Sequence, residues 1–162
     1  MLGFANIAAE EIVMPVDVTV ETVINKPREH VAGFVMDPSN DMKWINALKS
    51  VRLLTPPPVG TGARVERIAA FMGRKVEYVL EITDYRLGQL LDMKSVKGPF
   101  PMRVMYQFED KESGTLVRVK AHGEAGGFYK FASPMLAQSV KRYMAQDLEK
   151  LKQVLESNAS QS

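Results

Sequence analysis

Residues 128–155 read FYKFASPMLAQSVKRYMAQDLEKLKQVL, and this stretch decides the fold. Its apolar side chains recur at steps of three and four, which places them along one face of a helix. The opposite face carries charged side chains that suit water. Ser133 and Pro134 allow the helix either to begin there or to bend there. Such a helix would be about 40 Å long, so it must lie across a broad apolar surface.

The chain before this helix alternates with a period of two, which predicts strands. The first strand begins at Val16, and two short helices follow, one starting at Pro27 and one covering 39–48. Gly-rich turns then separate short strands, which indicates an antiparallel meander. The predicted strands after the helices are 51–54, 63–72, 75–85, 90–96, 102–109 and 115–124.

These elements predict an α+β fold of the order β-α-α-β6-α. A curved antiparallel sheet of about seven strands would wrap around the long C-terminal helix. We expect residues 1–15 to form an N-terminal extension, 16–156 the domain, and 157–162 a flexible tail.

Composition narrows the classes of function. A net charge of +2 with scattered Lys and Arg predicts no nucleic-acid partner. The chain has no cysteine, and His30 and His122 have unrelated spacing, so we expect neither a metal site nor a cofactor. The first basic residue is Lys26, which does not fit a secretory signal, and no apolar run is long enough to span a membrane. The expectation is a cytoplasmic monomer or homodimer.

In this order of elements the chain resembles the SRPBCC or START-like superfamily, the helix-grip fold, and its polyketide cyclase/dehydrase type. The residues that carry the resemblance are turn and packing residues, so they specify fold better than function. They are Pro27, Val31, Asp37-Pro38, Trp44, Gly60-Thr61-Gly62, Gly73-Arg74 with Val76-Glu77, 96–101, Gly114-Thr115 and the closing helix at 148–156. The resemblance implies a cavity between the sheet and the long helix.

Strand alternation predicts what lines such a cavity. Across the hairpin at Gly73-Arg74, Phe71 shares a face with Val76, and this face continues along both strands. The same reasoning applied to the later strands gives an aliphatic, aromatic and methionine-rich lining, which favours an apolar ligand. The predicted ligand-binding residues are Phe34, Trp44, Arg67, Phe71, Tyr78, Leu80, Met93, Met102, Val104, Tyr106, Val119, Phe131 and Met135. Phe128 and Phe131 could form a gate at the mouth.

Arg67 is the only charged residue on its inward face. It could anchor a carboxylate or carbonyl of a ligand, or it could reach the rim or be turned outward by a bulge. Tyr78 and Tyr106 could donate hydrogen bonds to a ligand or simply belong to the core. His122 has outward parity and is predicted to lie on the surface.

Three functions are compatible with these features. The first is binding or transport of a small hydrophobic molecule such as a lipid, quinone or polyketide-like compound. The second is a cyclase or dehydratase acting on a hydrophobic carbonyl substrate, for which no inward histidine or carboxylate pair is predicted, so no catalytic residue is assigned. The third is a protein-interaction module of chaperone-activator type that uses the outer face of the sheet.

Overall fold

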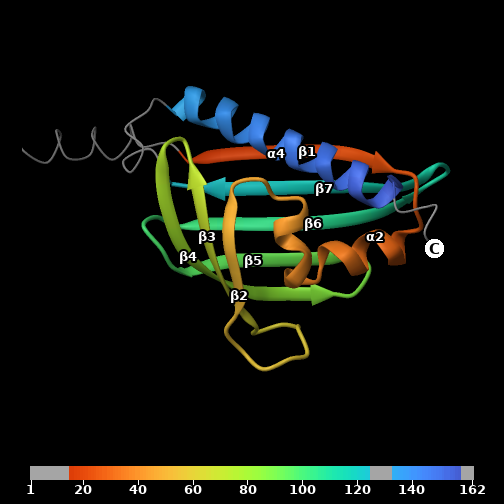
Figure 1. Ribbon diagram of the computed structural model, residues 1–162, viewed down its shortest axis with the longest axis horizontal. Coiled ribbons are helices and arrows are strands. Elements are labelled where there is room, and N and C mark those ends of the chain that lie inside the picture. The colour runs from red at the N-terminus through yellow and green to blue at the C-terminus, as the bar shows by residue number, and fades with distance from the viewer. Residues whose placement is uncertain (1–14, 125–132, 158–162) are drawn as a thin grey trace, which may run out of the picture.

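The computed structural model describes residues 15–124 and 133–157. Within them, one sheet curls beneath a long helix, and two short helices follow the first strand (Figure 1). The strands are β1 (Val16–Ile24), β2 (Leu48–Leu53), β3 (Arg64–Phe71), β4 (Arg74–Arg86), β5 (Leu90–Lys97), β6 (Met102–Lys111) and β7 (Gly114–Gly123). The helices are α2 (Arg28–Val35), the 3₁₀ helix η1 (Pro38–Lys43) and α4 (Ser133–Ser157). The predicted fold class is confirmed.

The strand order is β1-β7-β6-β5-β4-β3-β2, and every neighbouring pair is antiparallel. Strands that follow each other from β2 to β7 are therefore neighbours in the sheet, as short turns require. The exception is β1, which pairs with β7 from Val16 opposite Gly123 to Ile24 opposite Thr115. The first and the last strand of the chain thus lie side by side, and β1 and β2 form the two edges.

Helix α4 packs mainly against β1, and in Figure 1 it lies over this strand at the top of the view. Leu136, Leu148, Leu151 and Leu155 are its buried side chains, and their spacing of three, four and multiples of these follows the predicted apolar stripe. Pro134 lies in the first turn, where its missing N–H costs no helical hydrogen bond. The predicted start of the helix at residue 128, and the gate at Phe128 and Phe131, lie outside the described residues.

The second short helix differs from the prediction. An α-helix over 39–48 was expected, but η1 is a 3₁₀ helix that ends at Lys43. Asp37 caps it, because its Oδ1 accepts a hydrogen bond of 3.0 Å from the backbone N of Ser39. The chain is then free to begin β2 at Leu48 rather than at the predicted Val51.

The β3–β4 hairpin keeps the predicted parity. Its two turn residues are Met72 and Gly73 rather than the predicted Gly73 and Arg74; both have positive φ (50° and 77°), which is the backbone of a two-residue hairpin turn. Phe71 pairs with Arg74, and Arg67 consequently pairs with Tyr78. The side chains that face α4 from this hairpin are therefore those that the alternation predicted.

The core lies between the concave face of the sheet and α4, and it is filled with aliphatic side chains such as Ile24, Leu80, Ile82 and Val117. No helix within residues 15–124 and 133–157 is both long enough and apolar enough to cross a membrane.

Candidate functional site

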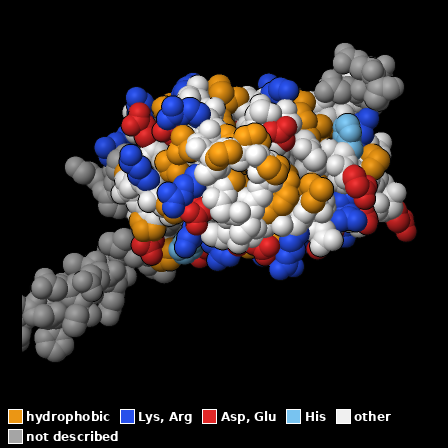
Figure 2. Space-filling model, turned by 90° about the horizontal axis from the view of Figure 1, so that it is seen from below, with side chains coloured by type: hydrophobic (Ala, Val, Ile, Leu, Met, Phe, Trp, Pro, Cys, Tyr) orange, Lys and Arg blue, Asp and Glu red, His pale blue; other side chains and the backbone are white. Residues whose placement is uncertain are grey.

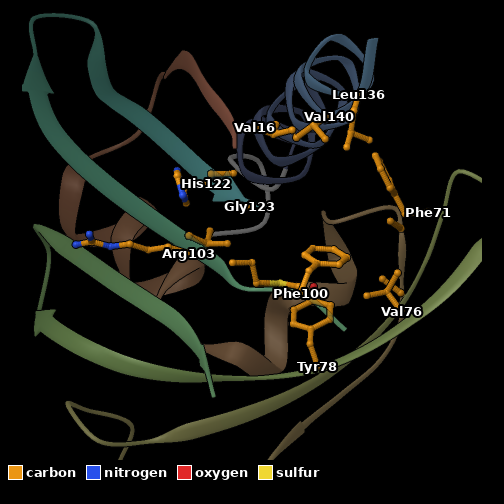
Figure 3. Close-up of a pocket in the computed structure, with 15 residues that line it drawn as sticks. Val16, Phe71, Val76, Tyr78, Phe100, Arg103, His122, Gly123, Leu136 and Val140 are labelled. Carbon is orange, nitrogen blue, oxygen red and sulfur yellow. The ribbon is translucent and has the colours of Figure 1, made fainter. Parts of the chain in front are cut away.

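A cavity of about 210 Å³ lies beneath the first turns of α4, at the end of the sheet where β1 and β6 begin and β7 ends. Its walls come from the β3–β4 hairpin, the loop between β5 and β6, the end of β7 and α4 (Figure 3). Aliphatic and aromatic side chains make up most of the lining. This end of the molecule is hollow because small residues line it, among them Ala47, Ala69, Ala121 and Gly123.

The predicted site residues divide into two groups in the structure. Those in contact with the cavity are Phe71, Tyr78, Met102 and Val104. Others belong to the packed core beyond it or around it, namely Trp44, Arg67, Leu80, Met93, Tyr106 and Val119, while the half-buried Phe34 packs against that core. Phe131 lies outside the described residues.

Met135 is a correction. It was expected to line the cavity, but its side chain is 63% exposed. Helix α4 directs the next residue, Leu136, and then Val140 into the cavity, and a step of one residue turns a side chain by about 100° around a helix.

Several lining residues were not among the predicted ligand-binding residues, including Val16 and Phe100. His122, which was predicted to lie on the surface, is half-buried and also lines the cavity. Val16 begins the alternating pattern of β1, so its inward position was readable from the sequence. Phe100 lies in the turn between β5 and β6, where no periodicity applies, and composition gave no signal for it.

Arg103 and His122, at the edge of the cavity, each contact a carboxylate outside it. Arg103 donates a hydrogen bond of 2.9 Å from Nε to Asp92, and its side chain extends away from the cavity in Figure 3. His122 Nδ1 lies 2.7 Å from a carboxylate oxygen of Asp17, the residue opposite it on β1. Within the described residues the hydroxyl of Tyr78 has no protein hydrogen-bond partner, so it is the polar group that the lining offers to a ligand.

A buried polar cluster borders the inner end of the cavity. Ala69 and Val76 form a cavity-lining pair on the β3–β4 hairpin, and the next inward-facing pair is Arg67 with Tyr78. Arg67 is only 4% exposed, and its Nη2 donates a hydrogen bond of 2.7 Å to Asp41 Oδ2. A second, longer contact of 3.4 Å joins the same nitrogen to the hydroxyl of Tyr106.

Arg67 therefore faces inward, as one of the alternatives had it, but it has an internal carboxylate partner. Asp41 is the residue that the sequence did not reveal, since it lies in η1, where polar residues are usually solvated. The ring of Trp44 packs edge-on against Tyr106 with ring centroids 5.8 Å apart. Among the described residues, two buried donors of the cluster have no partner, Arg67 Nε and Trp44 Nε1.

Burial controls the titration of the cluster. It raises the pKa of Asp41, and the Arg67 guanidinium opposes that rise. It also raises the pKa of Tyr106 to about 12, so this tyrosine stays a neutral hydroxyl at neutral pH. Burial alone would lower the pKa of Arg67, but Tyr106 and Asp41 outweigh it, and Arg67 remains a cation.

Asp147 adds a second carboxylate on the side of α4. Its Oδ1 accepts hydrogen bonds from the backbone N (3.0 Å) and the side-chain Nδ2 (2.9 Å) of Asn46, which ties the helix to the loop before β2. Burial raises its pKa, while those two hydrogen bonds and the charge of Arg67 lower it in part. Across residues 15–124 and 133–157 there is no group of His, Asp or Glu side chains arranged to hold a metal ion.

Comparison with known proteins gives a family and a fold. The family model described as "Polyketide cyclase / dehydrase and lipid transport" matches residues 15–156. No curated protein matches the sequence. Among solved structures, TTHA0849 from Thermus thermophilus is similar over 88% of this chain and 99% of its own, with a TM-score of 0.74 and 18% identity.

Two further structures are similar at comparable levels. The Zhui aromatase/cyclase from Streptomyces sp. R1128 has a TM-score of 0.71 and 15% identity, over 90% of this chain and 96% of its own. The structure of Ara h 8.0201 has a TM-score of 0.66 and 16% identity, over 90% of this chain and all of its own (100%). At such identities these likenesses concern the fold.

Proposed function

This chain belongs to the polyketide cyclase/dehydrase and lipid-transport family of the SRPBCC superfamily, and on that premise we propose that it binds a small hydrophobic molecule beneath α4. The observation that carries the proposal is the apolar cavity of about 210 Å³ in an otherwise packed core. An apolar cavity of roughly 150 Å³ is enough to bind benzene in a protein interior, so this one has room for a larger ring compound.

The lining also suggests the chemistry of the ligand. Its walls are apolar, and two polar side chains at its edge, Arg103 and His122, contact Asp92 and Asp17 respectively. A ligand with more than one charge would lose its hydration without compensation. An apolar molecule with one hydroxyl or carbonyl, placed toward Tyr78, fits best.

The test uses N-phenyl-1-naphthylamine, a neutral apolar probe whose fluorescence rises in apolar surroundings. We expect the wild type to bind it and Ala121→Leu to bind it at least about tenfold more weakly, because the added atoms fill the cavity. Ala70→Leu is the matched control, since Ala70 is exposed and is not part of the lining. Equal binding by Ala121→Leu and wild type would place the ligand elsewhere.

A second candidate, a cyclase-like activity, is favoured by the buried polar cluster at the inner end of the cavity. Arg67 Nε and Trp44 Nε1 are donors that an enolate or carbonyl oxygen could accept from, and Asp147 is a carboxylate with a raised pKa. Such groups are the ones needed to stabilise an oxyanion and to move a proton beside a carbonyl.

The activity is testable with 1-(2-acetylphenyl)propan-2-one, whose internal aldol condensation releases water and gives the fluorescent 3-methyl-1-naphthol. Catalysis would appear as naphthol formation faster than in buffer alone. The catalysed rate should fall at least about a hundredfold in Asp147→Asn, the usual range for loss of a general acid or base. A protein that binds the naphthylamine probe but leaves the naphthol rate at the buffer value is a binding protein without this activity.

A further inference from the structure

Basic residues are concentrated in three segments that line the cavity. Beside the start of β1 and the end of β7, three segments contribute lining residues: the β3–β4 hairpin (68–76), the β5–β6 connection with its flanks (93–108) and the first part of α4 (133–146). These three segments contain no Asp or Glu and carry seven Lys and Arg residues: Arg74, Lys75, Lys94, Lys97, Arg103, Lys141 and Arg142. The opposite end, with the β6–β7 turn and the end of α4, holds acidic and basic residues together, and side chains of both charges occur at both ends in Figure 2.

Neighbouring acids neutralise only part of this basic rim. Lys75 pairs with Glu77 at 3.0 Å, and Arg103 pairs with Asp92. Lys97 is exposed and has no ion pair within residues 15–124 and 133–157. Two exposed acids lie at the same end: Glu124, which follows β7 and has no ion pair within the described part of the chain, and Asp17, whose partner is His122. The net charge of the side chains around the mouth therefore stays positive.

Exposed apolar side chains lie on the same rim. Met135 on the first turn of α4 is 63% exposed, and Val96 at the end of β5 is 41% exposed. Pro99 and Pro101 in the next loop are exposed too. Large apolar side chains interspersed with Lys and Arg are the composition of surfaces that enter the interface of an anionic bilayer, where the apolar groups enter and the cations meet lipid phosphates.

We propose that the mouth end of the molecule docks on an anionic lipid surface through the hairpin, the β5–β6 connection and the start of α4. This proposal rests on the proposed function, because the membrane would be the source of the apolar ligand that the cavity binds. With the mouth against a bilayer, an apolar ligand passes between membrane and cavity without crossing water. The net positive charge of the rim steers the encounter, and Met135 and Val96 enter the interface.

The test is co-sedimentation with vesicles of phosphatidylglycerol and phosphatidylcholine in equal parts, against vesicles of phosphatidylcholine alone. We expect binding to the first only, and weaker binding as salt is added. Lys75→Gln with Lys97→Gln should weaken binding about thirtyfold, since a Lys near such a surface contributes about 1 kcal/mol. The matched control is Lys111→Gln with Lys150→Gln, which removes the same charge from exposed lysines at the opposite end.

Equal weakening by the two double variants would show a response to net charge alone and would overturn the proposal. So would wild-type protein that ignores the phosphatidylglycerol vesicles while it still binds N-phenyl-1-naphthylamine in solution, and that result would leave the proposed function standing. A third outcome is a protein whose vesicle binding weakens in Lys75→Gln with Lys97→Gln but not in the control, and which does not bind N-phenyl-1-naphthylamine. That result would support the docking surface and contradict the proposed function.

Discussion

Separating Arg67 from Asp41 should be far more damaging than removing both. Their charged atoms are 2.7 Å apart, and both side chains are almost fully buried, with 5% and 3% exposed. At an effective dielectric constant of about 20 the attraction amounts to about 6 kcal/mol. Desolvation of each ion costs several kcal/mol, so the pair as a whole contributes close to nothing. A single ion left without its partner keeps the cost and loses the attraction.

We therefore expect Asp41→Leu and Arg67→Met each to lower the free energy of unfolding by about 3–5 kcal/mol, and the double variant to lie within about 2 kcal/mol of wild type. Equilibrium urea unfolding measures this, followed by the fluorescence of Trp44, the only tryptophan, and by circular dichroism. A double variant as unstable as the sum of the two single losses would refute the view that the two charges stabilise mainly each other.

Two further predictions concern a glycine and a carboxylate. Gly114→Ala should destabilise the protein by more than about 2 kcal/mol, because the added Cβ would lie 2.1 Å from Ile24 O at a φ of 143°. Gly33→Ala should instead stabilise it by about 0.5–1 kcal/mol, because a Cβ at this position in helix α2 would have no atom within 4 Å. Urea unfolding midpoints measure both changes, and equal midpoints for the two variants would contradict the geometry. Burial raises the pKa of Asp147 above the unfolded value of 3.8, so the stability it contributes is full below that pH and is lost as the pH rises through the folded-state pKa. Asp147→Asn, which can still accept from Asn46, should gain stability relative to wild type over that window, and parallel pH curves for the two proteins would count against it.

The fold could be read from the sequence because its signals are local. Alternation in Val16–Ile24 and the glycine at the β3–β4 turn fix strand parity within a few residues of chain, although the turn itself lies one residue earlier than the predicted Gly73-Arg74. No contact between distant elements is needed to see them, and the observed strands begin and end within three residues of the predicted ones.

The candidate site was less predictable, because it depends on how distant elements meet. Asp41 reaches Arg67 across 26 positions of sequence through the packing of η1, and nothing in the local pattern marks it. Met135 was misplaced because an apolar stripe does not set the rotation of its helix. Helix α4 rests mainly on one edge strand, so it buries a narrower stripe, with Leu136 inward and its neighbour in water.

The pairing of β1 with β7 also constrains how the chain can be made. β1 leaves the ribosome first, yet its sheet neighbour and the helix that covers it are among the last elements synthesised. At about 5–20 residues per second, β1 waits several seconds with an unpaired edge and an apolar face. Pairing over such a sequence separation is intrinsically slow. We therefore expect a chain cut short before Gly123 to leave its first strand unpaired and to aggregate more readily than the full chain.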